Sequence, residues 1–256
     1  MRIGIAGLQT TDLVAKSIKE TLSDAGFDSF YLKNNLQVTT ADLVIVLGGD
    51  RGVRNHFHHT LDVDTPVLGI SESESSGFLS QIELKDLSSY LSRIKKQDYV
   101  IENVPRIGIK IDGKDVYPVL NDVAIFSSKS ATLMEHVLRV NGEEVWHDSS
   151  DGVIISTPIG SSAYSMSAGG PVIFQAANVF GIISVNSLDI TRRPIIVSDN
   201  SIIEIDEISS RLHCDVVLDG IDRLKINSKL EATRFTPPAR IIRMKSDSTA
   251  ISALAN

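Results

Sequence analysis

The sequence predicts an α/β domain followed by a β-rich, sandwich-like domain. In residues 1–100, apolar runs typical of buried strands alternate with segments of helical periodicity, a pattern that favours a parallel sheet. In residues 101–234, short strands of alternating pattern are separated by glycine-containing turns, which favours a β-sandwich. With 256 residues, the chain is long enough for two modest domains that each bury a core.

The first domain is expected to contain three strands and three helices. The strands are short apolar runs, and the run DLVIVL has the continuous hydrophobicity of a strand buried on both faces. The first helix has apolar residues on one face and Gly26 just beyond its end. In chain order we predict strand 2–6, helix 11–25, strand 42–47, helix 51–61, strand 66–70 and helix 84–96.

Tight turns organise the second domain. Asp112-Gly113, Asn141-Gly142 and Asp219-Gly220 are dipeptides that readily adopt the backbone conformations of hairpin turns. A small, polar and glycine-rich segment, residues 161–175, is expected to open with a helix. The predicted strands are 106–111, 137–140, 143–146, 195–197, 202–205, 216–218 and 224–226, with strand character again near 241–244.

Composition excludes several classes of protein. The net charge of −7 is unlike that of a typical nucleic-acid binder, and no apolar run approaches the roughly 20 residues that cross a bilayer. The N-terminal segment MRIGIAGLQ lacks the features of a secretory signal, so we expect a cytoplasmic protein. A single cysteine, Cys214, excludes an intrachain disulfide and a thiolate metal cage, and its apolar surroundings predict burial.

No metal site held by the protein alone is expected. His56, His58 and His59 form a cluster, but no acidic or cysteine partner stands at a matching spacing. We therefore expect these imidazoles to lie on an exposed face or at the rim of a substrate site.

The first segment that carries chemistry is Gly48-Gly49-Asp50, which follows a predicted buried strand. Ligands of open α/β sheets gather at the carboxyl ends of strands, and glycines let a phosphate chain approach the backbone. An aspartate there can orient Mg²⁺ or accept a proton from an attacking hydroxyl. Taken alone, the three residues are equally compatible with a turn that ends the strand.

The second segment is Asn121-Asp122, which is flanked by strand residues on both sides. A polar pair in such a position needs hydrogen-bonding partners. A carboxamide next to a carboxylate suits the two vicinal hydroxyls of a ribose. A β-bulge or an exposed strand edge is the alternative.

The third segment, residues 151–171, reads DGVIISTPIGSSAYSMSAGGP, a buried strand that enters a loop dense in hydroxyls and glycine. Small residues permit close approach by a ligand, and Tyr164 offers a flat ring and a phenol. Gly160 precedes an expected helix start, where nucleotides and anions bind readily. A tight packing loop is the alternative.

This third segment resembles the signature of the NAD kinases, DG-x-x-x-STPTGSTAY-x-x-SAGGP. LVIVLGGD resembles the family's GGDG block, and LNDVAIF resembles its Asn-Glu block with aspartate in place of glutamate. PVLGI followed by GFL resembles the segment GIN-x-G-x-x-GFL, while TRRPIIVSDNSIIEI and VVLDG fit later sandwich strands. The blocks occur in the family's order and cover residues 42–230.

The resemblance implies an NAD kinase that transfers a phosphoryl group to the adenosine 2′-hydroxyl of NAD. It implies an α/β domain and a β-rich domain with NAD in the cleft, and a tail, residues 235–256, that packs on the first domain. NAD and a nucleoside triphosphate such as ATP would be the ligands, with Mg²⁺ neutralising phosphate charge. The family's members are homodimers or homotetramers in which a neighbouring subunit can complete the pocket; no nucleic-acid or membrane partner is implied.

The resemblance also assigns roles to particular residues. Asp50 matches the catalytic aspartate, and Asn121 with Asp122 match the pair that holds the adenosine part of NAD. Asp151 matches a carboxylate of the NAD pocket. The remaining expected ligand-binding residues are Gly48, Gly49, Arg51, Phe78, Ser162, Ala163, Tyr164 and Ser167.

Four departures from the family pattern bear on these roles. Arg51 stands where glycine is usual, and could obstruct the ligand or add a cation facing the triphosphate. SESESS, residues 71–76, replaces the GIN-x-G stretch, Ile159 replaces a hydroxyl residue, and Ile221 replaces a glutamine. These departures leave two alternatives: a sister kinase that acts on another hydroxylated substrate such as a lipid or sugar, and a non-catalytic NAD- or nucleotide-binding protein.

Overall fold

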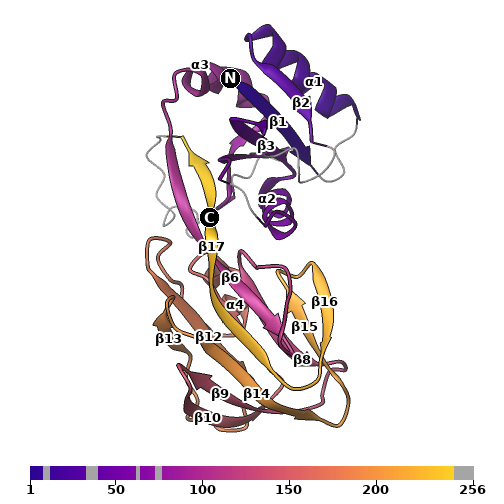
Figure 1. Ribbon diagram of the computed structural model, residues 1–256, viewed down its shortest axis with the longest axis vertical. Coiled ribbons are helices and arrows are strands. Elements are labelled where there is room, and N and C mark those ends of the chain that lie inside the picture. The colour runs from indigo at the N-terminus through magenta and orange to yellow at the C-terminus, as the bar shows by residue number, and fades with distance from the viewer. Residues whose placement is uncertain (8–11, 33–39, 62–63, 73–76, 245–256) are drawn as a thin grey trace. The chain divides into compact units, whose positions relative to one another are not determined.

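A computed structural model describes residues 1–7, 12–32, 40–61, 64–72 and 77–244. The chain forms two compact units. The first contains Met1–Val104 and, of the described tail, residues 237–244; the second contains Pro105–Thr236. Two long strands, β6 (Val100–Ile111) and β17 (Leu230–Arg243), contribute residues to both units (Figure 1).

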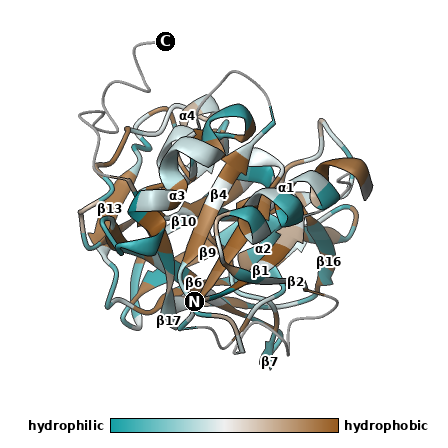
Figure 2. Cartoon of the chain, turned by 90° about the horizontal axis from the view of Figure 1, so that it is seen from above, coloured by the Kyte–Doolittle hydropathy of each residue, from teal (hydrophilic) through white to brown (hydrophobic). Residues whose placement is uncertain are grey.

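The first unit is built on a parallel sheet with the strand order β4-β3-β1-β2. The strands are β1 (Arg2–Gly7), β2 (Asp28–Tyr31), β3 (Leu43–Leu47) and β4 (Val67–Ser71). β5 (Ser80–Glu83) and the end of β17 pair in parallel with β4. Every residue of β3 and β4 is buried, which explains their continuous apolar sequence, and β4 is mainly brown in Figure 2.

The helices of this unit are α1 (Asp12–Asp24), α2 (Gly49–His58) and α3 (Leu87–Lys95). All three predicted helices are confirmed, with different ends. α2 begins two residues earlier than predicted because positive-φ glycines turn the chain directly out of β3. The third predicted helix opens as a 3₁₀ turn, η2 (Leu84–Asp86). β2 and β5 were not predicted, because both are short and lack a long apolar run.

The second unit contains two β-sheets. In one, β10-β9-β14-β17 are antiparallel neighbours, with β6 beside β17 and β7 beside β6. The other is antiparallel in the order β13-β12-β11-β8-β15-β16. The bounds are β7 (Lys114–Asp115), β8 (Asp122–Ser127), β9 (Met134–Val140), β10 (Glu143–Ser150), β11 (Gly152–Ser156), β12 (Val179–Val185), β13 (Ile195–Ser198), β14 (Ile203–Ser210), β15 (Cys214–Leu218) and β16 (Asp222–Ile226).

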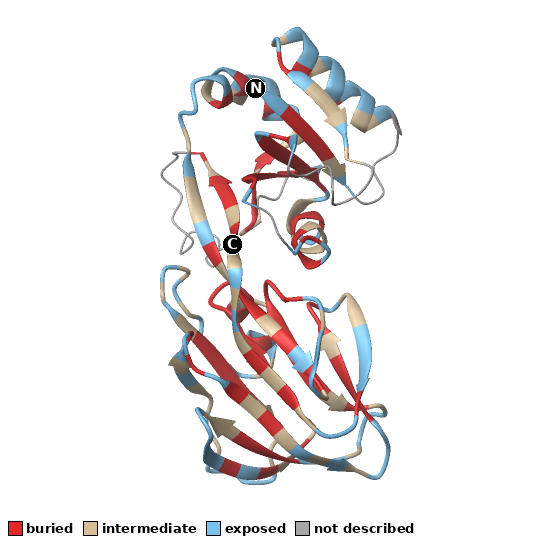
Figure 3. Cartoon of the chain, in the orientation of Figure 1, coloured by how far each residue is buried: buried red, intermediate tan, exposed pale blue. Residues whose placement is uncertain are grey.

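A hydrophobic core joins residues of both sheets in the second unit, including Ile107, Ile125, Leu138 and Phe180. Buried residues alternate with partly exposed ones along β14, and Figure 3 shows this alternation as changing colours. Cys214 is buried in this core, as predicted, and burial raises the pKa of its thiol. The predicted fold class, an α/β domain followed by a β-rich domain, is confirmed.

The predicted hairpin turns are also confirmed. Asp112-Gly113 and Asn141-Gly142 have positive φ at both positions, the conformation that suits a two-residue hairpin. Asp219-Gly220 likewise has positive φ and joins β15 to β16. The glycine-rich segment that follows β11 opens, as expected, with helical turns, η3 (Gly160–Ser162) and α4 (Tyr164–Ser167).

Among the described residues, none of the helices has the length and hydropathy that a membrane span requires.

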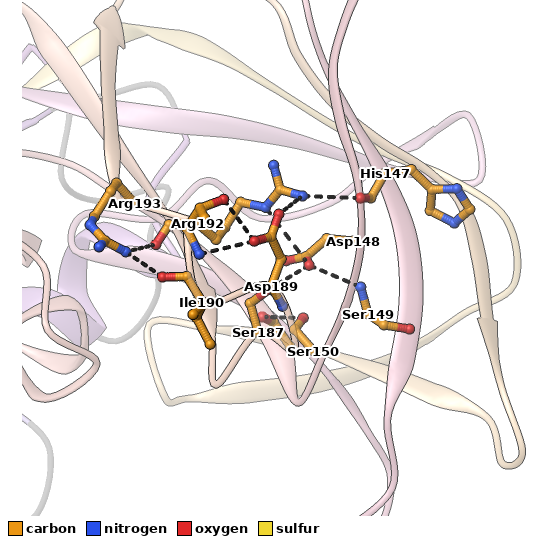
Figure 4. A network of polar contacts seen from close by, with 11 residues as sticks. His147, Asp148, Ser149, Ser150, Ser187, Asp189, Ile190, Arg192 and Arg193 are labelled. Carbon is orange, nitrogen blue, oxygen red and sulfur yellow. Dashed lines mark hydrogen bonds and ion pairs between the residues drawn. The ribbon is translucent and has the colours of Figure 1, made fainter.

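A polar network attaches residues 187–193 to β10 (Figure 4). The Ser187 hydroxyl donates to Asp148 Oδ1 over 2.6 Å. Arg192 forms ion pairs with Asp148 at 3.8 Å and Asp189 at 3.1 Å, and its guanidinium lies 4.8 Å from the centre of the Trp146 ring. Asp148 is buried, so this cation offsets part of the cost of removing its charge from water.

His136 on β9 lies directly opposite Asp148 and is completely buried. Burial disfavours the charged imidazolium and lowers the pKa of His136 to about 4, although the negative charge of Asp148 acts in the opposite direction. The folded protein therefore holds this histidine neutral, whereas an unfolded chain protonates it below a pKa of about 6.5.

This difference predicts acid destabilisation. As pH falls from about 6.5 to about 4, protonation of the unfolded chain should lower the free energy of unfolding by about 3 kcal/mol. The part contributed by His136 levels off once the folded protein is protonated as well. Urea unfolding measured across this pH range should show that His136→Gln removes this dependence. The matched variant of the half-exposed His213, His213→Gln, should retain it, and equal pH dependence in both variants would contradict the assignment.

Candidate functional site

The turn from β3 into α2 carries the Gly-Gly-Asp segment. Gly48 and Gly49 have φ values of 95° and 63°, in the left-handed region that glycine adopts without strain. A Cβ at Gly52 would lie 2.0 Å from the carbonyl oxygen of Leu47, so only glycine fits there. Arg51 is exposed on α2. At this helix start, Gly52 is therefore the residue whose backbone lies too close to a neighbour for a side chain. Arg51 points outward and does not obstruct the turn.

Asp50 binds the backbone of a second loop. Its Oδ2 accepts a hydrogen bond from the Phe78 amide at 2.8 Å. Its Oδ1 accepts from the Leu79 amide, the Ser80 amide and the Ser80 hydroxyl, each at 2.9 Å. A Cβ at Gly77 would lie 2.0 Å from Asp50 Oδ1. The Gly-Phe-Leu sequence is thus a loop that wraps the Asp50 carboxylate, and Oδ2 retains acceptor capacity for a further donor or a cation.

Residues near the end of β17 hold the same loop from its carbonyl side. The Arg243 guanidinium donates to the Phe78 carbonyl oxygen, and its Nε donates to Glu102 Oε2 at 2.6 Å. Ser80 and Arg243 are members of this cluster that the sequence does not predict. Neither lies in a conspicuous motif, because the contacts join segments that are 28 to 165 residues apart.

In the second unit, Asn121 and Asp122 lie where the chain enters β8, and both are buried, with 8% and 6% of their surface exposed. The Asp219 carboxylate accepts hydrogen bonds from three successive amides, those of Leu120, Asn121 and Asp122, at 2.8, 2.7 and 3.2 Å. The sequence predicts Asp219 only as part of a turn. The polar pair is therefore a braced backbone segment, not an exposed strand edge.

The hydroxyl-rich loop packs directly on this pair. The Thr157 amide donates to the Asn121 carbonyl oxygen at 2.8 Å, and the Thr157 hydroxyl donates to the Leu120 carbonyl oxygen at 2.7 Å. A Cβ at Gly160 would lie 2.0 Å from the Asn121 carbonyl oxygen. The structure thus brings two of the three predicted segments together, and Gly160 is required by this contact.

We call the contact between residues 120–122 and 157–160 the junction. The side chains at and next to the junction differ in whether their polar atoms or rings are available to a ligand. Asn121 Oδ1 is buried and accepts no hydrogen bond from the described part of the chain. Ser162 donates its hydroxyl to Ile159 at 3.0 Å, while Tyr164 and Ser167 are exposed on α4, with Ala163 just before that helix. Burial and the negative charge of Asp122 raise the pKa of Tyr164. The junction therefore combines an unused buried acceptor, a carboxylate and an accessible aromatic ring.

Asp151 lies apart from this junction. It precedes β11, whose last residue, Ser156, pairs with Asp122, while Gly152 at its start pairs with Phe126. At about 3.4 Å per residue, the five residue steps from Asp151 to Ser156 separate Asp151 from Asp122 by roughly 17 Å along the strand. Its carboxylate accepts a hydrogen bond from Asn186 Nδ2 at 2.8 Å. Within the second unit, the structure does not bring Asp151 together with the other predicted ligand-binding residues.

Two departures from the family pattern are accommodated by packing. Ile159 is buried, so its side chain packs inside the protein. The Ile221 amide closes the β15–β16 turn by donating to the Leu218 carbonyl oxygen at 2.8 Å. Of the SESESS segment, Ser71 ends β4 and Glu72 is exposed, and residues 73–76 lie outside the described part.

The histidine cluster lies on and just after α2, where His58 is buried and its ring packs edge-on against that of His59 at 4.9 Å. In the portion of the chain that the structure describes, no three His, Cys, Asp or Glu side chains form a group that could hold a metal ion.

Comparisons with known proteins match both units. Residues 11–99 match the family model of the ATP-NAD kinase N-terminal domain, and residues 120–235 match that of the C-terminal domain. An NAD kinase of Methanopyrus kandleri is 32% identical over 205 residues, covering 80% of this chain and 74% of the relative. An NAD kinase of Clostridium perfringens is 32% identical over 228 residues, covering 86% and 82%.

Solved structures agree. An NAD kinase from Archaeoglobus fulgidus in complex with ATP has a TM-score of 0.82 and 25% identity, covering 96% of this chain and 94% of that one. A yeast NADH kinase complexed with NADH has a TM-score of 0.84 and 18% identity, covering 100% of this chain and 86% of that one, and shares its fold.

The contact between Gly160 and Asn121 predicts that Gly160→Ala is destabilising. Its methyl group would displace backbone on one side or the other, at a cost of about 1–3 kcal/mol. Gly142→Ala is the matched control, because that glycine has nothing within 4 Å of its ideal Cβ among the described residues and a positive φ, so it should cost about 1 kcal/mol. Thermal unfolding compares the two, and an equal or smaller loss for Gly160→Ala would contradict the close approach.

Proposed function

The chain belongs to the NAD kinase family and is a kinase, and we propose that it phosphorylates the adenosine 2′-hydroxyl of NAD, with ATP as phosphoryl donor and Mg²⁺ as the divalent cation. One observation carries the proposal beyond family membership. The hydroxyl-rich loop and the Asn121-Asp122 pair form one braced junction that leaves a buried acceptor unused. The reaction would take place in the cytoplasm, with neither nucleic acid nor membrane as a partner.

We assign the adenosine part of NAD to this junction in the second unit. Asn121 Oδ1 needs a donor, and a ribose hydroxyl supplies one. Asp122 can accept from the neighbouring hydroxyl, and the exposed ring of Tyr164 offers a face on which a base can stack. The exposed Ser167 and the small Ala163 would line this site together with Ser162.

The phosphates are assigned to the turn between β3 and α2. Gly48 and Gly49 leave the backbone open to close approach, and Arg51 adds an exposed cation to the first turn of α2. Asp50 would accept the proton of the attacking hydroxyl or help to hold Mg²⁺ through the free capacity of Oδ2. Mg²⁺ commonly binds through one or two carboxylates together with substrate phosphates, and when bound it neutralises the charge of the transferring group. Phe78, fixed beside Asp50, would line the same turn.

These assignments place phosphate binding and NAD binding in different domains. We propose that residues 1–100 with the tail 235–256 handle the phosphates and that residues 101–234 bind NAD. The compact units of the fold change at 104/105 and 236/237, close to these limits.

We further propose that the protein works as a homodimer or homotetramer. Asp151 is about a strand's length from the junction of its own unit, so it would serve a ligand held by a second copy. Its partner Asn186 opens a segment in which Leu188 and Ile190 are 65% and 87% exposed. Exposed aliphatic side chains of this kind favour contact with another protein surface.

The first test is catalytic. Purified protein with Mg²⁺ and ATP should convert NAD to NADP, and panels of donors, of NADH and of lipid and sugar acceptors would show its specificity. Asp50→Asn should lower kcat by about a hundredfold to a thousandfold, because it removes the base and a negative charge. Ser80→Ala removes one of the four hydrogen bonds to Asp50 and should stay within about tenfold of the wild type. A folded Asp50→Asn variant with unchanged kcat would overturn the catalytic role.

The second test uses mixed subunits. Asp122→Ala and Asp151→Ala should each be inactive. After subunit exchange, their mixture should regain about a quarter of wild-type activity. Half of the dimers then pair unlike chains, and each of these has one intact pocket out of two. A mixture of Asp122→Ala with Asn121→Ala, both altered at one junction, should stay inactive. Failure of the first mixture to regain activity, despite demonstrated exchange, would refute a pocket shared between copies.

A further inference from the structure

Asp219 has more contacts than a turn residue needs. It directly follows β15, is buried, and adopts a left-handed backbone conformation with φ of 52°. Besides accepting from three successive amides of residues 120–122, it donates its own amide to the Asp122 carbonyl oxygen at 2.9 Å. Closing the β15–β16 hairpin requires none of these contacts, because the Ile221 amide already closes it.

A buried cation interacts electrostatically with this carboxylate. Arg106 on β6 is almost completely buried, and its guanidinium lies 4.8 Å from the centre of the Phe235 ring. Burial lowers the pKa of Arg106 to about 10, and the negative charge of Asp219 opposes that decrease. A buried charge is costly without an opposite charge, so this attraction offsets part of the cost of burying both groups.

The geometry of the three amide hydrogen bonds explains why Asp219 matters for ligand binding. Three neighbouring amides can point at one carboxylate only if the backbone of residues 120–122 is curved around it. That backbone curvature sets the positions of the Cα atoms from which the side chains of Asn121 and Asp122 extend. Thr157 and Gly160 confine the same segment from the other side. Without Asp219, three buried amides would lose their acceptor, and the segment would have to rearrange to satisfy them.

We propose that Asp219 is the positioning residue that keeps Asn121 and Asp122 in the conformation that binds the adenosine part of NAD. The inference rests on the proposed function, since it assumes that this pair touches NAD. Asp219 acts through the backbone amides and is assigned no role in the chemical step.

The test compares two buried aspartates of one hairpin. Asp219→Asn keeps an acceptor but turns an NH₂ group toward one of the amide donors. Asp215→Asn, at the other end of β15, disturbs an ion pair with Arg223 at 3.1 Å and a contact with His213 at 3.6 Å but leaves residues 120–122 untouched. Calorimetric titration with NAD, without phosphoryl donor, should show affinity weakened about tenfold to a hundredfold for Asp219→Asn. The Asp215→Asn variant should stay within about threefold, although both variants lower the unfolding temperature.

A double-mutant cycle separates positioning from general destabilisation. If Asp219 acts through Asn121 and Asp122, adding Asp219→Asn to a variant that carries both Asn121→Ala and Asp122→Ala should weaken NAD binding by less than about threefold further. Fully additive losses, or a folded Asp219→Asn variant with wild-type affinity, would overturn the inference while leaving the proposed function intact. Unchanged affinity in Asp122→Ala and in Asn121→Ala would overturn the proposed function and this inference with it.

A measurement on the wild type covers the case in which Asp219→Asn fails to fold. If the three amides are already bound by Asp219, their hydrogen exchange should be slow without NAD and should slow by less than about threefold when NAD is added. Exchange that is fast without NAD and becomes protected on binding would show that NAD orders the segment, which contradicts positioning by Asp219.

Discussion

A carboxylate that is wholly or partly shielded from water needs hydrogen-bond donors, and three aspartates of this chain find them in the amides of a distant segment. Asp50 accepts from the amides of residues 78–80, Asp112 from those of 227–229, and Asp219 from those of 120–122. For Asp112, partial burial alone would raise the pKa of the carboxyl group, but the hydrogen bonds together outweigh it and lower this pKa well below its usual range. Each aspartate thereby joins a turn to a loop or strand that is far away in sequence. Two of the three, Asp50 in the first unit and Asp219 in the second, contact segments for which ligand binding is proposed.

This arrangement explains what the sequence could and could not predict. The run 42–47 and the Asn141-Gly142 turn are local signals, and the structure confirms both because neighbouring residues alone decide them. The grouping of residues 120–122 with 157–160 was foreseen only through family resemblance. The brace by Asp219 was missed, because an aspartate before glycine looks the same whether it merely turns the chain or also binds amides roughly 100 residues away. The short strand β5 depends on pairing with β4, so its own sequence carries little signal.

Glycines at the site have two different physical causes. Gly48 and Gly49 are required by backbone conformation, whereas Gly52, Gly77 and Gly160 are required because another group occupies the space of a Cβ. The second cause is invisible without a structure. It also accounts for the tolerance of Arg51: the helix start is tight at the next residue, while position 51 faces outward. A family motif can therefore lose one glycine and keep its geometry when the crowded position is elsewhere.

Because β6 and β17 contribute residues to both units, the two units become complete at different times during synthesis on the ribosome. Residues 105–236 are continuous, so the second unit can fold as soon as they have emerged. The first unit takes its last strand pairing from Ile241 and the brace of the Phe78 loop from Arg243. The first unit can therefore complete its contacts only after the C-terminal end of the chain has been synthesised. The hydrogen bond from Arg243 to the loop around Asp50 forms among the last contacts of biosynthesis.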